Sequence, residues 1–184
     1  MTNTAKLSFA SFASLALGVV LACGGSHSSS NNASKLAYTN PTQGDYRLEA
    51  VGGSGTDTLT LALRGPSYVR ARGANFGLSI DTAKVGCVQQ GASYAGQGTV
   101  FDLGADPKIF RAVLDSGNLR VSMAQKGNSV AAKPMSGDIA TVRLQLQSGA
   151  QKGTVQLTPL AAKVLLENGT EQTILVSVGK LEAQ

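Results

Sequence analysis

The longest regular pattern in the chain is an alternation of apolar and polar residues from Ala140 to Gln147. The apolar side of this alternation consists of Ala140, Val142, Leu144 and Leu146. A period of two predicts a β-strand with one buried face. Ser136-Gly137 before it is a turn signal, and after the Gly149 to Gly153 turn region the segment Thr154 to Thr158 reads as a second, short strand. A strand with one apolar face needs a second sheet to cover that face.

The same period recurs along the chain from Asp45 onward, and no segment shows a convincing helical period. Alternating or short apolar runs occupy residues 45–51, 57–64, 73–81, 85–89, 99–103, 108–115, 119–124, 160–167 and 173–179. The chain has 22 Gly, many of them between these runs. Short strands at regular spacing with Gly-rich turns predict an all-β sandwich.

Two of the turns carry hairpin signals. Ser116-Gly117-Asn118 separates two alternating runs, and Asn168-Gly169 separates another two. Asn-Gly favours a type I′ turn because both central residues of that turn need φ > 0. We therefore interpret Asn168-Gly169-Thr170 as a hairpin turn and not as a glycosylation sequon.

The N-terminus has the pattern of a secretion signal. Lys6 precedes an apolar or small-residue stretch from Leu7 to Ala22, which at about 16 residues is short for a membrane span of about 20. The stretch ends in Val20-Leu21-Ala22-Cys23, which resembles the lipobox of bacterial lipoproteins, with Leu21 where a smaller residue is usual. This resemblance implies cleavage before Cys23 and lipid attachment to its thiol.

After Cys23 the chain reads GGSHSSSNNAS, a composition typical of a flexible tether. Several acyl chains hold a protein firmly at a membrane, since each buried CH₂ contributes about 0.8 kcal/mol. Gly24 stands where an Asp would mark inner-membrane retention in many proteobacterial lipoproteins, so the resemblance favours the outer membrane. We expect a signal peptide at 1–22, a tether at 23–44 and a globular domain at 45–184.

The two cysteines and the single histidine limit the chemistry. If Cys23 is acylated, Cys87 has no disulfide partner, and its apolar neighbours favour a small buried side chain. His27 lies in the expected tether, so no catalytic triad and no His-containing metal site can be built in the domain. Paired carboxylates remain conceivable at Asp102 with Asp106 or at Asp57 with Asp81, but the residues as a whole favour a protein without catalytic activity, metal or cofactor.

The distribution of charge and the aromatic residues limit the classes of partner that the chain could bind. The net charge is +5 and the cations are scattered, with Arg70 and Arg72 the one close pair after the leader, which argues against nucleic acid. Phe76, Phe101 and Phe110 are expected in the core. Tyr68 and Tyr94 lie in loops, where they could stack on a sugar, although polysaccharide binding usually needs a row of exposed aromatics.

The order of these segments resembles that of cohesin-like domains, which are related to certain carbohydrate-binding modules. The matching stretches are Phe76 to Asp81, Val85 to Gly91, Ser116 to Ala124, Gly137 to Leu144 and Leu160 to Gly179. Leu144 stands where an aromatic residue is usual, a tolerable core exchange. The resemblance covers most of residues 45–181 and implies a nine-stranded jelly-roll sandwich.

The resemblance implies a binding module, since the family includes domains that bind dockerins through one sheet face. No contact motif of that family matches this chain, so no contact residue is carried over. The leading hypothesis is a non-enzymatic, lipid-anchored module that recognises a protein at the bacterial cell envelope. Two alternatives stay open: a polysaccharide-binding module, and a structural or assembly lipoprotein of a secretion or pilus system.

Overall fold

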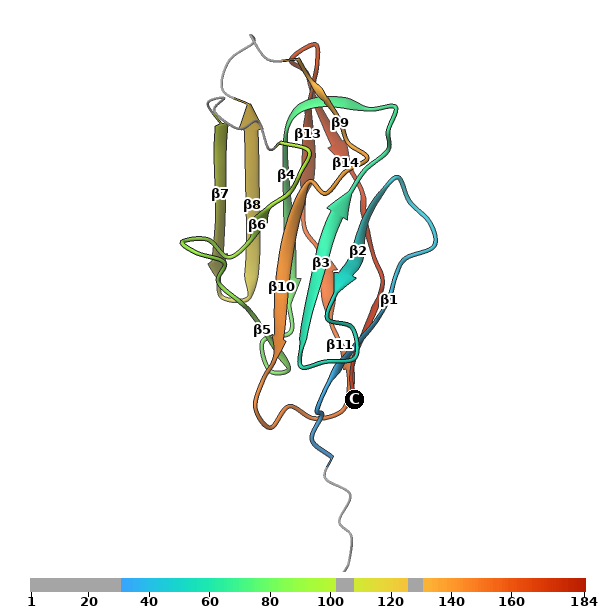
Figure 1. Cartoon of the computed structure of the whole chain (residues 1–184), viewed down its shortest axis with the longest axis vertical. Helices are drawn as coiled ribbons and strands as arrows, with labels where there is room; N and C mark the ends of the chain where they lie inside the picture. Colours follow the sequence, from blue (N-terminus) through green and yellow to red (C-terminus); the bar gives the residue numbers. More distant parts are fainter. Residues whose placement is uncertain (1–30, 102–107, 126–130) are drawn as a thin grey trace, which may run out of the picture.

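A computed structural model describes residues 31–101, 108–125 and 131–184. These residues form β-strands, turns and loops without a helix, and the strands are packed as a sandwich (Figure 1). The described part therefore contains no helix long and apolar enough to cross a membrane. The all-β sandwich predicted from the alternating pattern is confirmed.

The larger sheet is built around β4, the longest described strand. Its path is β14-β13-β4-β8-β7, and β9 and β12 also pair with β4. The strands are β4 (Arg70–Ile80), β7 (Lys108–Asp115), β8 (Asn118–Gln125), β9 (Lys133–Pro134), β12 (Leu157–Pro159), β13 (Ala162–Leu166) and β14 (Glu171–Ile174).

The smaller sheet faces it across the core, and a third, short sheet joins the first and the last described strands. The smaller sheet contains β15 (Val176–Val178), β2 (Tyr46–Gly52), β3 (Thr58–Arg64), β10 (Ala140–Leu146), β5 (Val85–Cys87) and β6 (Gly96–Gln97). The third sheet contains β1 (Leu36–Thr39), β16 (Lys180–Ala183) and β11 (Gly153–Val155). β15 and β2 pair in parallel, and the other described strand pairs are antiparallel.

The core consists of the inward side chains of both sheets. On β10, Val142 and Leu144 are fully buried between β3 and β5, while Arg143 between them is exposed. On β4, Phe76, Leu78 and Ile80 are buried in the same cluster. The face assignments predicted from alternation in these two strands are confirmed, because period-two side chains point to opposite faces.

Both predicted hairpins are present, but the type of the second turn differs from expectation. Ser116 and Gly117 have φ values of 48° and 80°, the combination that a type I′ turn needs, and they join β7 to β8. At the second hairpin only Gly169 has a positive φ, 85°, and its N–H donates to Leu166 O. The type I′ expectation for Asn168-Gly169 is wrong, because this loop is a longer turn with Gly169 alone in the left-handed region.

The boundary of the domain lies closer to the N-terminus than expected. Residues 23–44 were predicted to be tether, but β1 pairs with β16, and Leu36 is fully buried. Ala33 and Ser34 already donate backbone hydrogen bonds, to Ala150 O and Gln184 O. The described residues from about 31 onward therefore belong to the folded domain.

The strand count also differs from nine, since the described residues contain sixteen strand segments. Several are short pieces of two or three residues, such as β6 and β9, too short for an alternation to show. The predicted strand Thr154 to Thr158 is divided at Gln156, because Val155 pairs with β16 and Leu157 with β4. One continuous alternation thus serves two sheets.

Candidate functional site

The outer face of the larger sheet is the surface most suited to binding. We define this outer face by the outward residues of β4, β7, β8 and β13, which strand register places side by side. In one row Lys163, Asn75, Ser122 and Arg111 are neighbours across the four strands. The next rows add Leu165, Gly73, Ala124 and Ile109, and then Gly77, Arg120 and Val113.

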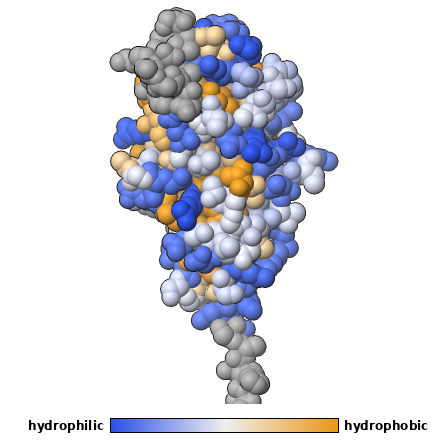
Figure 2. Space-filling view, viewed as in Figure 1, coloured by the Kyte–Doolittle hydropathy of each residue, from blue (hydrophilic) through white to orange (hydrophobic). Residues whose placement is uncertain are grey.

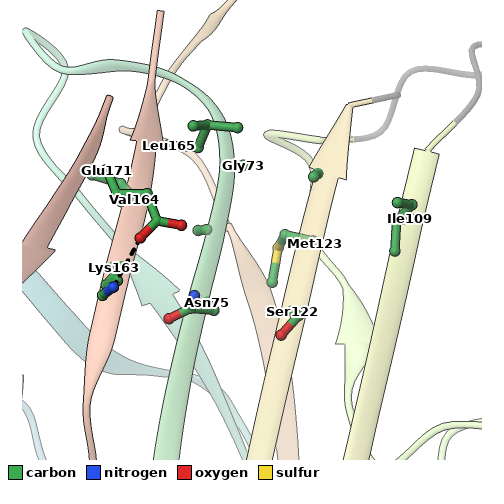
Figure 3. Close-up of a pocket in the computed structure, with 11 residues that line it drawn as sticks. Gly73, Asn75, Ile109, Ser122, Met123, Lys163, Val164, Leu165 and Glu171 are labelled. Atoms are coloured by element: carbon green, nitrogen blue, oxygen red, sulfur yellow. Dashed lines mark hydrogen bonds and ion pairs between the residues drawn. The ribbon is translucent and has the colours of Figure 1, made fainter. Parts of the chain in front are cut away.

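Two glycines of β4 lie in the middle of this face. A side chain at Gly73 would meet Met123 O at 2.8 Å, and one at Gly77 would meet Cβ of Leu160 at the same distance. Gly73 lines a shallow hollow of about 200 Å³ over β4 and β8, whereas Gly77 lies outside this hollow, against Leu160. In Figure 3, Asn75 and Ser122 lie on the floor of the hollow, Ile109 on one side, and the ion pair of Lys163 with Glu171 on the other.

The outer face combines exposed apolar side chains with cations that lack a counter-ion. Ile109 is 56% exposed and Val113 41%, both on β7. Arg111 and Arg120 are exposed beside them, and neither has an ion-pair partner among the described residues. Exposed apolar groups next to unneutralised charges are features of a surface that a partner protein covers.

The outer face of the smaller sheet also carries an exposed cation without a described partner, Arg143, but four of its charged side chains form one network. Arg64 donates to Asp138 at 2.7 Å and to Glu49 at 3.2 Å, and Arg47 lies 3.0 Å from the other oxygen of Glu49. The hydrogen bond to Asp138 raises the pKa of Arg64 above its usual value. The charges in this network already neutralise one another. In Figure 2, hydrophobic residues occupy small areas between hydrophilic ones.

Of the carboxylates considered from the sequence, Asp57 and Asp81 lie within the described residues. Asp57 precedes β3 and is exposed, whereas Asp81 follows β4 and accepts a hydrogen bond from the Ala83 N–H at 3.2 Å. Asp102 and Asp106 lie outside the described residues. Within the described ranges, no group of three or more His, Cys, Asp or Glu side chains could hold a metal ion. Cys23 and His27 also lie outside the described residues.

The aromatic residues give no sugar-binding row. Phe76 and Phe101 are buried as predicted, while Phe110 is half-buried at the sheet edge. Tyr94 is half-buried against the core. Tyr68 is 74% exposed, and its hydroxyl donates to Asp45 at 2.8 Å. Because Tyr68 is the one strongly exposed aromatic side chain of the described residues, the arrangement does not favour a polysaccharide platform.

Cys87 is half-buried on β5, opposite Leu144 of β10. Burial raises the pKa of the Cys87 thiol to about 12. The thiolate is the reactive form of cysteine, and near neutral pH this thiol stays protonated. The side chain is therefore placed for packing and not for chemistry.

We expect Cys87 to react slowly with a maleimide or disulfide reagent at pH 8 in the folded protein and rapidly in denaturant. Unfolding returns the pKa to that of an exposed thiol, so the thiolate fraction at pH 8 rises by more than about tenfold. Mass spectrometry of labelled peptides separates Cys87 from Cys23. Equal labelling rates in the folded and unfolded states would contradict a packed thiol.

Sequence reasoning missed the outer face as a site. Its residues are Gly, Asn, Ser, Arg and Lys at outward positions, and such residues are also typical of an ordinary solvated sheet. The available signal was the pair Gly73 and Gly77 inside one predicted strand, since glycine in a strand often marks a close approach of backbone or ligand. Leu160, whose N–H donates to Gly77 O at 2.9 Å, makes that approach.

Comparison with known proteins supports the fold. No family model and no curated protein sequence matches the chain. A type II cohesin domain from the cellulosome of Acetivibrio cellulolyticus aligns with a TM-score of 0.56 and 13% identity, over 81% of this chain and 94% of that one. The second type II cohesin module of the adaptor scaffoldin A of that organism gives 0.56 and 11%, over 79% and 92%.

A third similar structure is the sixth cohesin of scaffoldin B from Acetivibrio cellulolyticus, solved in complex with a dockerin. It aligns with a TM-score of 0.52 and 15% identity, over 80% of this chain and 96% of that one. At identities this low the likeness concerns the fold. The domain is a cohesin-like β-sandwich, as the order of segments predicted.

Proposed function

We propose that this protein is a non-enzymatic, lipid-anchored binding module that holds a partner protein at the bacterial cell envelope. The observation that carries the proposal is the outer face of the larger sheet. It presents Ile109 and Val113 as exposed apolar groups and Arg111 and Arg120 as cations without counter-ions in the described structure. Cohesins of the same fold are found in complex with dockerins.

The chemistry of the outer face defines the partner that fits it. Its hollow beside Gly73 accommodates a protruding apolar side chain of the partner. Arg120 beside it attracts carboxylates, which would neutralise a charge that lacks a described counter-ion. The fitting partner is therefore a protein with an apolar ridge flanked by acidic residues, for which a dockerin-like domain is one example. Burial of the apolar groups would supply affinity, and the charges would supply orientation.

Site-specific photo-crosslinking in the expressing cells tests this proposal. A photoreactive amino acid is placed at Ser122, in the middle of the outer face, or at Gln145, an exposed position on the outer face of the smaller sheet. We expect an adduct of discrete mass, other than a dimer of the chain, from position 122 and not from position 145. Equal adducts from both positions, or none, would count against the outer face.

Charge reversal then tests the chemistry of recognition. In the position-122 background, Arg120→Glu is expected to reduce the adduct about tenfold, because it replaces an attractive charge by a repulsive one. The matched control is Arg143→Glu on β10, an exposed arginine of the other sheet, which should leave the adduct unchanged. If Arg120→Glu has no more effect than Arg143→Glu, the partner does not use this charge.

A further inference from the structure

β7 is an unusually long edge strand. It ends the path of the larger sheet and pairs only with β8, over eight consecutive residue pairs without a register shift. The other strands at the ends of sheet paths, β14, β15, β5, β1 and β11, have only three or four residues. Short edges are a protection against pairing with another chain, and a long regular edge lacks that protection.

The backbone of β7 has free hydrogen-bonding groups toward this edge. Asp115 and Asn118 flank the type I′ turn and form a hydrogen-bonded pair, as a two-residue hairpin requires. Since hydrogen-bonded and non-hydrogen-bonded pairs alternate, Val113, Arg111 and Ile109 also bond to β8. The N–H and C=O groups of Phe110, Ala112 and Leu114 therefore point away from β8. No described strand accepts them.

The side chains of β7 are self-complementary. Val113 is flanked at two residues on either side by Arg111 and Asp115, and all three lie on the outer face. Arg111 has no ion-pair partner among the described residues, and the Asp115 carboxylate accepts only a hydrogen bond from the Ser116 hydroxyl there, at 3.1 Å. An antiparallel copy of the same segment reverses this order, so cation meets anion on both sides of the valine.

We propose that β7 pairs with β7 of a second copy of this chain, antiparallel and centred on Val113. Val113 then lies opposite its counterpart, and each Arg111 lies opposite Asp115 of the other copy. Ala112 and Leu114 form hydrogen-bonded pairs across the axis with the backbone groups that are otherwise free. The interface is isologous, as a two-fold dimer requires. The two larger sheets become one continuous sheet, with both outer faces on the same side.

Other registers fit less well. A register is possible only if the edge-pointing backbone groups of one copy meet those of the other. One copy must therefore slide along the other by two residues at a time. The next register places Arg111 opposite Val113 and Ile109 opposite Asp115. The one after it places Arg111 opposite Arg111, and like charges directly opposite are destabilising. The register centred on Val113 is the one with two opposite-charge pairs.

The pairing is expected to be weak in dilute solution. One strand edge buries less than the roughly 1,200 Å² of a standard stable interface, which belongs to the weak or transient class. Copies held on one membrane would meet at a far higher local concentration. A dimer with both outer faces on one side would also present two equivalent binding surfaces to a multivalent partner, which raises avidity without new contacts.

Disulfide crosslinking of the full chain in the membranes of expressing cells tests the geometry. Residues at a non-hydrogen-bonded antiparallel pair have Cα atoms about 4.5 Å apart, within the range of a disulfide. Val113→Cys is therefore expected to give a crosslinked dimer on mild oxidation. Ile109→Cys, a more exposed position of the same strand, lies beyond the paired segment and should give at least about tenfold less. The unsubstituted chain reports crosslinking through Cys23 or Cys87.

Charge exchange tests the register. In the Val113→Cys background, Arg111→Asp alone and Asp115→Arg alone each bring like charges together and should reduce the crosslinked dimer about tenfold. Coexpression of these two variants restores opposite charges in the mixed dimer, and crosslinking should return. Arg143→Asp, on the other sheet, should leave the amount of crosslinked dimer unchanged.

Equal crosslinking at positions 109 and 113, no crosslinking, or no recovery on coexpression would overturn the proposal. A position-113 adduct with a different protein would identify the edge as a site for another partner.

Discussion

Replacing Leu144 with alanine is expected to lower the free energy of unfolding by about 2–5 kcal/mol. The Leu144 side chain is fully buried on β10, where it lies opposite Leu59 of β3 and Cys87 of β5. Alanine loses the transfer energy of the missing carbons, and it leaves a cavity because a strand paired on both sides cannot collapse into the space. Urea denaturation followed by fluorescence or circular dichroism measures the loss.

Arg143→Ala, one residue away, is the matched control for Leu144→Ala. The Arg143 side chain is exposed on the opposite face of β10, and it has no side-chain partner among the described residues. Its removal should change the free energy of unfolding by less than about 0.5 kcal/mol. Equal losses in the two variants, or a larger loss for Arg143→Ala, would contradict the assignment of faces. A changed slope of unfolding free energy with urea would point to an altered unfolded state.

The contrast between these neighbours also explains why the register of β10 is firmly set. A shift by one residue would move Arg143 and Gln145 to the core side and expose Val142 and Leu144. Burying an unpaired guanidinium costs several kcal/mol, in addition to the lost burial of two aliphatic side chains. A strand with such a pattern has one acceptable pairing, so local alternation was sufficient to predict its faces.

Alternation could not predict the N-terminal strand. The sequence of β1, Leu-Ala-Tyr-Thr, is too short to show a period, and its partner β16 lies more than 140 residues away. Tertiary contacts hold this strand in place. Leu36 is buried in the core, and the Tyr38 hydroxyl donates to Leu48 O at 2.8 Å and accepts from the Gly179 N–H at 2.7 Å. Such long-range pairing leaves no mark in a local window, which is why residues 36–44 read as tether.

The outer face of the larger sheet likewise could not be predicted as a site from local sequence patterns. Each strand by itself presents a few polar or small residues to solvent, and nothing in one strand distinguishes a binding surface from an ordinary one. Register brings Asn75 of β4 beside Ser122 of β8 and Lys163 of β13, although these residues are more than 40 positions apart along the chain. The hollow depends on Gly73 facing the same way as these polar residues. A sequence can indicate such a face only after the strand order is known.

The N-terminal extent of the domain also changes the expected geometry of anchoring. The described chain begins at Asn31, whose carbonyl accepts a hydrogen bond from Lys152 N–H at 2.9 Å. Asn31 is eight positions after Cys23, and a fully extended chain of eight steps spans at most about 28 Å. The 22-residue tether expected from composition would have allowed more than twice that reach. If Cys23 carries lipid, the domain stays close to the membrane surface, and copies on one membrane are held in a thin layer.

Cys23→Ser is accordingly expected to abolish membrane attachment of the chain or to leave an uncleaved precursor. The lipobox-like sequence before Cys23 predicts that its sulfur carries the lipid, and a serine hydroxyl cannot form that thioether. Several acyl chains at about 0.8 kcal/mol per buried CH₂ hold a protein on a membrane. The described part of the chain has no helix long and apolar enough to cross one. Metabolic labelling with a palmitate analogue, followed by membrane fractionation, measures both incorporation and attachment.

Cys87→Ser is the matched control and should keep the label, because Cys87 lies on β5 within the sandwich. If Cys23→Ser takes up as much label as the unsubstituted chain, the lipid is carried elsewhere. If neither takes up label, the chain is not a lipoprotein. The crowding on one membrane that favours β7 pairing would then be lost, although the pairing itself would remain open to test in solution.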